Sequence, residues 1–302
     1  MAYTTEDFLN LKNPTAFTSV HKVHKTLGHS KKQVKKELLK LDAYRLHHPA
    51  PRKFPRRRVY SPFPDLTWGL DLAEIRKYSK SNYNKNYILV CLDFFDRHAW
   101  FEPLKTKNTE EVLAAFKNIL ERSGRKPQAI THDKGREFVS KTFKEFCASN
   151  NIHQFYTNSP MKCSMCERLV RTLFQIIAKY MTHFNTKRFV HKLRDIENVY
   201  NNSYHRSIKR SPASVNDKNY WEVWHAQYGK VIPKPKPKLA IGDTVLRIKD
   251  KPLFTKGYAQ TFEKEPFTVF QVKDTNPPTY LIENEDGKVR RAFYTQELLK
   301  IN

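Results

Sequence analysis

The stretch LTWGLDLAEI, residues 66–75, is followed by NYILVCLDFF, residues 86–95, and by HAWFEPL, residues 98–104. All three stretches are rich in apolar, aromatic and β-branched residues, and polar, turn-like breaks separate them. We therefore predict three consecutive strands, with Asp71 in the middle of the first.

Helices and strands alternate in the residues that follow. A helix is predicted over 108–124, with Asn108 or Thr109 as its N-cap and Gly124 as its stop. Three strands followed by alternating elements predict an α/β sheet domain rather than a bundle or a barrel. The further elements expected are a strand at 128–133, a helix at 140–150, a strand at 152–156 and two long helices within 164–203.

The composition points to a polyanionic partner. The chain of 302 residues has 55 Lys and Arg against 30 Asp and Glu, a formal net charge of +25. Nucleic acid is the commonest partner of so basic a protein, and the alternative is a soluble protein with solvated charged faces.

Two stretches rich in proline and basic residues divide the chain. HHPAPRKFPRRRVYSPFPD precedes the first predicted strand, and KVIPKPKPKLA follows the last predicted helix; both compositions favour extended, charged spacers. The predicted organisation is a helical domain at 1–46, a basic linker at 47–65, the α/β core at 66–229, a Pro/Lys linker at 230–240 and a small β domain at 241–302.

The two outer domains are small. In the first, one helix ends at Gly28, and Ser30 and Gln33 stand in capping-box positions of a second helix, so a helix-turn-helix is one interpretation. In the last, four or five short strands with sharp turns predict a small SH3-like or chromo-like barrel.

The cysteines and the hydropathy of the chain indicate in which cellular compartment the protein is expected. Four unevenly spaced cysteines argue for a reducing compartment and against a disulfide framework. No signal peptide is recognisable and no apolar run approaches the roughly 20 residues of a membrane span, so no membrane partner is expected. The cluster RKFPRRR at 52–58 is interpreted as a nuclear localisation signal, a phosphate-tracking linker or a solvated loop, and we expect a nuclear protein.

Three carboxylates are placed where chemistry on a polyanion could occur. Asp71 lies within a strand, Asp133 ends a short strand before a glycine turn, and Glu167 opens a long helix. Such residues can converge, and their hard oxygen atoms suit two Mg²⁺ or Mn²⁺ ions in phosphoryl transfer. Each residue alone has a structural alternative: a hydrogen-bonded strand Asp, a turn Asp, or a Glu favoured by the helix dipole.

Other acidic residues are less suitable. Asp93 and Asp96 flank a predicted strand-to-strand turn, so we expect a structural role for them. Glu74 lies three residues along the strand from Asp71 and is expected to point to the opposite face of the sheet.

Five motifs of the central region are distinctive when taken together: WGLDLAEI, YILVCLDFFDRHAWFEPLKTK, THDKGREFVSKTFKEF, ERLVRTLFQIIAKYM and VYNNSYHRSIKRSPASVN. Together they resemble the core of the DDE integrases of the retroviral superfamily. The resemblance is closest to integrases of Maverick/Polinton-type transposons and to transposon-derived cellular copies of them, and it extends over nearly the whole chain.

The resemblance implies an RNase H-like core with a mixed five-stranded sheet. Asp71 would bridge two metal ions, while Asp133 and Glu167 would each hold one of them. The implied reactions are hydrolytic trimming of a DNA 3′ end and attack of that end on a target phosphodiester. Double-stranded DNA and self-association follow from the resemblance. The sequence departs from the family pattern at His132 and Val170.

No structural zinc is expected. No cysteine precedes Cys91, so the N-terminal zinc module of retroviral integrases cannot form in its usual way. The pair Cys163 and Cys166 has zinc-clamp spacing, but no second CxxC or HxxxH lies near it, and it lacks the context of a redox pair.

Basic residues near these carboxylates are candidates for DNA contact. Arg171 sits one helical turn beyond Glu167 and could pair with it or reach a phosphate. Lys134 follows Asp133, and Lys162 and Arg168 flank Glu167. The leading hypothesis is a metal-dependent DNA integrase; the alternatives are a domesticated, inactive DNA- or chromatin-binding protein and a nuclease for RNA or hybrids.

Overall fold

The computed structural model describes residues 3–51, 53–156, 164–250, 258–289 and 291–301. The chain forms two compact units. One unit comprises residues 59–232, and the other combines residues 1–58 with residues 233–302. Each unit is described by itself. In the described residues, no helix has the length and apolarity that crossing a membrane requires.

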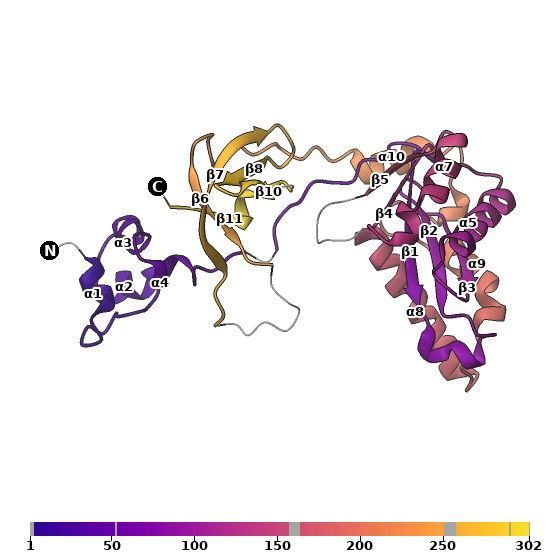
Figure 1. The fold of residues 1–302 in the computed structure, drawn as a ribbon, viewed down its shortest axis with the longest axis horizontal. Helices are drawn as coiled ribbons and strands as arrows, with labels where there is room; N and C mark the ends of the chain where they lie inside the picture. The colour runs from indigo at the N-terminus through magenta and orange to yellow at the C-terminus, as the bar shows by residue number, and fades with distance from the viewer. Residues whose placement is uncertain (1–2, 52, 157–163, 251–257, 290, 302) are drawn as a thin grey trace. The chain divides into compact units, whose positions relative to one another are not determined.

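A mixed five-stranded sheet forms the centre of the first unit (Figure 1). Its strand order is β3-β2-β1-β4-β5, in which β1 to β3 are antiparallel and β4 and β5 run parallel to β1. This is the RNase H-like core that the sequence predicts. The strands are β1 (Thr67–Glu74), β2 (Tyr87–Asp93), β3 (Ala99–Leu104), β4 (Ala129–His132) and β5 (His153–Tyr156).

One layer of helices covers the first face of the sheet. It contains α5 (Thr109–Ser123), α6 (Arg136–Val139) and α7 (Lys141–Ser149). Asn108 is the N-cap of α5, and Gly124 ends it in the left-handed conformation at a φ of 62°, as the sequence predicts. Phe116 of α5 and Phe143 of α7 pack in one core with alternate residues of β1 and β2, which include Trp68, Leu70 and Leu89.

The second layer covers the opposite face. It contains α8 (Ser164–His183) and α9 (Leu193–Asn202), the two helices predicted within 164–203, and α10 (Tyr220–Tyr228) follows them. The other set of alternate strand residues packs here, including Ala73, Ile88 and Val90, together with Cys166, Leu169 and Leu173 of α8.

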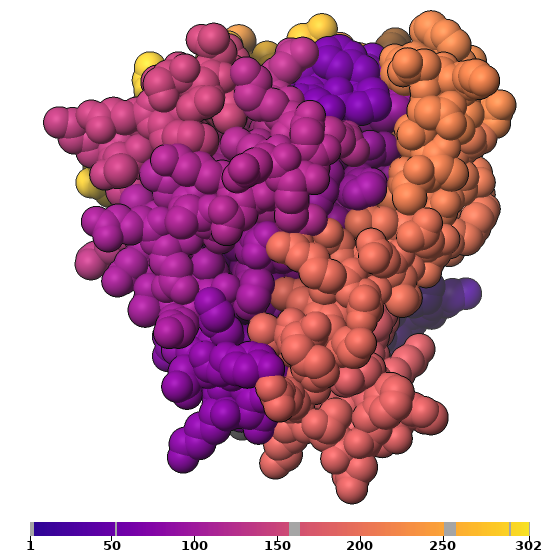
Figure 2. Space-filling view, turned by 90° about the vertical axis from the view of Figure 1, so that its right-hand side faces the viewer, coloured from indigo at the N-terminus to yellow at the C-terminus, as the bar shows by residue number. Residues whose placement is uncertain are grey.

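An ion network ties α5 to α9 at one side of the sheet. The Arg122 guanidinium donates to both carboxylate oxygens of Glu197, at 2.7 and 2.8 Å. Figure 2 shows the surface of this side, where the magenta segment around α5 lies beside the orange segment around α9. The network joins the two helical layers around the edge strand β3, because Arg122 also contacts Glu102 at 3.1 Å.

The second unit contains the N-terminal helices and the C-terminal strands. Apolar side chains hold the helices together: Phe8, Val23, Val34 and Leu38 are buried. Ser30 is the N-cap of α3, but its side chain makes no capping hydrogen bond, so the predicted capping box is wrong. The helices are α1 (Thr5–Leu9), α2 (Val20–Leu27), α3 (Lys31–Leu38) and α4 (Asp42–Arg45).

The C-terminal strands form one antiparallel sheet of six strands, more than the four or five predicted. Its order is β10-β8-β7-β6-β11, and β9 pairs with β8. The strands are β6 (Thr244–Ile248), β7 (Phe262–Lys273), β8 (Thr279–Asn284), β9 (Gly287–Lys288), β10 (Phe293–Tyr294) and β11 (Leu298–Lys300), and 3-10 turns lie at Arg76–Ser81, Val190–Lys192, Pro212–Ser214 and Thr295–Glu297.

The segment predicted as a basic linker has fixed contacts at both ends. The Phe54 ring lies 5.5 Å from the Tyr294 ring, and the Arg57 N–H donates to the Tyr294 hydroxyl at 3.0 Å. At its other end, Ser61 exchanges hydrogen bonds with the Tyr228 hydroxyl of α10. Residues before 59 thus belong to the second unit and residues after 58 to the core unit.

Candidate active site

The parallel pairing of β1 with β4 brings two of the predicted carboxylates to the same level. Gly69 pairs with Thr131. If this register continued for two more residues, it would put Asp71 level with Asp133, the first residue after β4. Directly paired residues on neighbouring strands point to the same face of a sheet, so the two side chains would then share a face.

Backbone N–H groups orient both carboxylates. Asp71 is half-buried, and its Oδ1 accepts a hydrogen bond from the Leu72 N–H at 2.9 Å. Asp133 is also half-buried, and its Oδ1 accepts from the Gly135 N–H at 3.0 Å. One oxygen of each carboxylate is held in this way, which reduces the side-chain freedom that a bound ligand would otherwise have to remove.

Gly69 determines how closely α8 approaches this face. A Cβ atom built on Gly69 would lie 2.3 Å from the Cys166 sulfur and 2.5 Å from the Phe94 ring. Only glycine permits such an approach. Cys166 is fully buried, and Glu167 is the next residue of α8. Cys166 is therefore a packing residue that holds the first turn of α8 against β1, while Cys163 lies outside the described residues.

Asp71 lies on the α8 side of the sheet, and Glu167 belongs to the first turn of α8. Alternation along β1 places Asp71 on the same face as Gly69 and Ala73, and both glycine and alanine contact this layer. Glu167 is exposed on the first turn of α8, one residue after the contact with Gly69.

The donor set suits divalent ions with oxygen ligands. Carboxylate oxygens are what Mg²⁺ and Mn²⁺ prefer, and Mg²⁺ usually takes only one or two of them beside water and substrate oxygens. Within the described part of the chain, no three His, Cys, Asp or Glu side chains are grouped closely enough to hold one ion.

An open cleft of about 860 Å³ begins at Asp133. Its lining residues include three cations, Lys107, Lys134 and Arg136, and two further acids, Glu110 and Glu137, next to the N-terminus of α5. Lys134 is exposed, and its Nζ lies 5.4 Å from the centre of the Tyr156 ring. Cations and a helix N-terminus at the mouth of a site attract phosphate groups.

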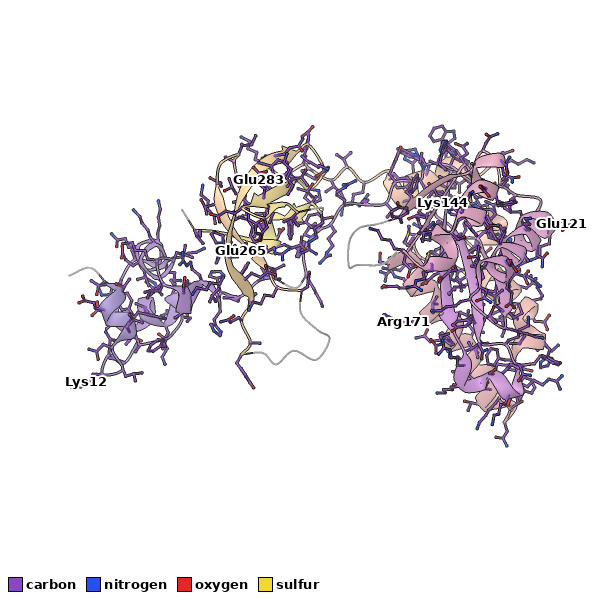
Figure 3. All side chains as sticks on the ribbon, viewed as in Figure 1. Lys12, Glu121, Lys144, Arg171, Glu265 and Glu283 are labelled. Carbon is purple, nitrogen blue, oxygen red and sulfur yellow. The ribbon has the colours of Figure 1, made fainter. Side chains whose placement is uncertain are left out.

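The other basic residues predicted to contact DNA lie around α8. Arg171 is exposed one turn beyond Glu167, and Figure 3 shows it at the margin of the core unit. Arg168 is exposed as well and lines a second cleft, to which Arg97 and Arg206 also contribute. Sequence reasoning missed the last two, because they are far apart along the chain. Lys162 lies outside the described residues.

The rival carboxylates have structural partners. Arg125 donates to Asp93 at 2.7 Å and lies 2.8 Å from Asp96, and the Phe95 N–H donates to Asp93 at 2.7 Å. Burial is the largest cause that raises the pKa of Asp93, to about 8, and the charge of the neighbouring Asp96 is the second. These contacts agree with the predicted structural role. Glu74 pairs with Arg76 at 3.4 Å on the exposed end of β1.

Comparisons with known proteins agree with this fold. The integrase core domain family matches residues 63–162, which contain Asp71 and Asp133 and end before α8. The transposon-derived protein F54H12.3 of Caenorhabditis elegans is 30% identical over 223 residues, which are 74% of this chain and 75% of that protein.

Two solved structures are also similar. A chain of the simian T-cell lymphotropic virus intasome, solved with PP2A regulatory subunit B56 gamma, is 17% identical with a TM-score of 0.65 over 93% of this chain and 98% of that one. The HTLV-2 integrase catalytic core, solved with magnesium, is 19% identical with a TM-score of 0.42 over 50% of this chain and 96% of that core. The chain belongs to the family of transposon-derived proteins that carry an integrase core domain.

Proposed function

We propose that this protein is a DNA integrase that trims a DNA 3′ end and joins it to target DNA. One observation supports the proposal: Asp71 lies on the face of β1 that α8 covers, and Glu167 follows Cys166, the residue of α8 that packs on Gly69. Continuing the β1–β4 register by two residues would put Asp133 level with Asp71. Membership of the integrase core family supports the same reaction class, and the motifs favour a Maverick/Polinton-type origin.

Asp71, Asp133 and Glu167 would hold the Mg²⁺ or Mn²⁺ ions, which would supply stabilisation of charge on the attacking and leaving oxygen atoms. The Leu72 and Gly135 N–H groups keep Asp71 and Asp133 oriented while the substrate enters. In trimming, water supplies the oxygen that replaces the leaving 3′ oxygen; in joining, the DNA 3′ hydroxyl replaces it.

The protein's cations bind and position the DNA backbone. Lys134 stands at the mouth of the Asp133 cleft, and Arg171 stands beside Glu167. Contacts of this type fix the register of DNA without reading its sequence. The net charge of +25 supports double-stranded DNA as the partner. The likeness to an intasome chain supports self-association. We also propose that the protein acts in the nucleus.

Strand transfer with purified protein and DNA ends from the element tests the proposal. Asp133→Asn removes a metal ligand and is expected to abolish joining in both Mg²⁺ and Mn²⁺ while leaving DNA binding intact. Glu74→Gln is the matched control, because it removes one carboxylate from the same strand on the opposite face.

The competing functions give different results. DNA binding by the wild type without nicking or joining in either metal would support a domesticated, inactive DNA-binding protein and refute the integrase. Faster cleavage of an RNA–DNA hybrid than of duplex DNA would support a nuclease instead.

A further inference from the structure

A second cleft, of about 540 Å³, lies beside the first turns of α8 in the core unit. Its walls come from α8, from the end of α9 with the segment after it, and from the turn between β2 and β3. Three arginines line it, together with a histidine, a threonine, two serines and two tyrosines; no Asp or Glu is among its lining residues. They are Leu92, Arg97, Met165, Arg168, Leu169, Thr172, Tyr200, Ser203, Tyr204, His205, Arg206 and Ser207.

The arginines of this cleft form no direct ion pair in the described residues, although the Asp93 and Asp96 carboxylates act on Arg97 from a distance. In the described part of the chain, none of the three guanidinium groups of Arg97, Arg168 and Arg206 forms an ion pair with a carboxylate. Arg97 donates instead to the Gln227 side-chain oxygen at 2.5 Å and to the Met165 sulfur. A thioether is a weak acceptor, so the hydrogen bonds of Arg97 do not neutralise it.

Arg97 occupies an unusual backbone position. Its φ is 64°, in the left-handed region. That conformation costs a residue with a Cβ atom about 1 kcal/mol or more, and glycine or asparagine would fit the turn better. The turn therefore holds an arginine at a position where a small residue would be more stable, and it directs that arginine into the cleft.

The potential of the cleft also acts on its histidine. Burial is the largest cause that lowers the pKa of His205, to about 4, and the positive charges of Arg97 and Arg168 lower it further. The imidazole is therefore neutral at physiological pH, where it adds no further positive charge to the cleft in the absence of a ligand.

We propose that this cleft binds a phosphate group, which the hydroxyls and three arginines of the cleft would hold by charge-assisted hydrogen bonds. Arginine is suited to this because its planar guanidinium donates to two phosphate oxygens at once. The phosphate belongs to a DNA strand that passes along the exposed side of α8, and in this respect the inference rests on the proposed function. Tyr204, 67% exposed at the rim, offers a ring on which an adjoining base can stack.

Binding of a fluorescent DNA duplex over a series of salt concentrations tests this inference. Arg206→Gln is the main variant, because Arg206 is exposed and its loss leaves the packing of the core intact. The slope of log affinity against log salt is expected to fall by about one, with roughly tenfold weaker binding. Lys144→Gln is the control: it removes one exposed positive charge from α7, in the opposite layer (Figure 3). Arg168→Gln provides a second variant with the same expectation.

Calorimetric titration with inorganic phosphate separates the two sources of the group. Phosphate binding that Arg206→Gln removes, with an unchanged DNA salt slope, supports the cleft but assigns it to a free phosphate. The inference would be overturned if Arg206→Gln and Arg168→Gln both bound phosphate and duplex DNA with wild-type affinity and salt slope. It would also be overturned if the wild type bound poly-glutamate but neither phosphate nor DNA. An absence of strand transfer in wild-type protein that still loses phosphate or DNA affinity on Arg206→Gln would refute the proposed function alone.

Discussion

Gly69→Ala tests whether the packing of α8 on β1 positions Glu167. The added Cβ would lie 2.3 Å from the Cys166 sulfur and 2.5 Å from the Phe94 ring. Ordinary contacts between such atoms are about 3.5 to 4 Å, so the first turn of α8 must move away by roughly 1 Å or more. Both neighbours are buried and cannot turn aside.

Two magnitudes follow from that displacement. Overpacking of a core typically lowers the free energy of unfolding by about 1–3 kcal/mol. A displacement of about 1 Å at a reacting group can lower its rate by roughly a hundredfold. Strand transfer is therefore expected to fall by about two orders of magnitude, while the folded protein remains the dominant species at 25 °C.

The assay compares single-turnover strand transfer with urea unfolding on the same preparations. Ile119→Val is the control: Ile119 is fully buried on α5 in the opposite layer, and losing one methylene typically costs about 0.5–1.5 kcal/mol. If Gly69→Ala keeps a transfer rate within about twofold of Ile119→Val, the contact of Gly69 with Cys166 does not position Glu167.

Three further predictions concern charged groups. Arg122→Met removes the bidentate partner of the buried Glu197 but leaves its ion pair with Arg194, so the free energy of unfolding in urea is expected to fall by about 2 kcal/mol. The exposed Lys141→Met should lower it by less than about 1 kcal/mol. Because the pKa of Asp93 is raised from 3.8 to about 8, its contribution to stability is present at acid pH and is lost as the pH rises through 8. The free energy of unfolding should fall between these two pKa values by up to about 1.4 kcal/mol per pH unit. Asp93→Asn should flatten this pH dependence, and an unchanged slope would contradict the raised pKa of Asp93. The pKa of His205 is about 4 in the free protein and should rise when the negative charge of DNA enters the cleft, so NMR titration should show a higher pKa with duplex present. DNA affinity should therefore increase as the pH falls from about 7 to 5 in the wild type but not in His205→Asn.

The elements of the core could be predicted because their signals are local. Apolar β-branched runs mark β1 to β3, and Asn108 and Gly124 bound α5 as the sequence indicates. The carboxylates were recognisable by position, since Asp71 lies within a strand and Asp133 follows one. These features depend on residues within a few positions of each other.

The rest depends on contacts between distant segments. Cys166 approaches Gly69 only in the folded sheet. The sequence therefore draws attention to the spacing of Cys166 from Cys163 and cannot show that Cys166 packs on β1. The cleft of Arg97 and Arg206 assembles from segments about a hundred residues apart. Likewise, Phe54 belongs to a stretch whose composition predicts a solvated linker, yet it packs on the ring of Tyr294.

Calorimetric titration of Mn²⁺ into protein with bound DNA tests the convergence of the three carboxylates most directly. Because Asp71 is shared, Asp71→Asn should abolish binding of both ions, while Glu167→Gln should weaken one. Glu74→Gln should bind as the wild type does. Unchanged Mn²⁺ affinity and stoichiometry in Asp71→Asn would contradict the assignment of the site.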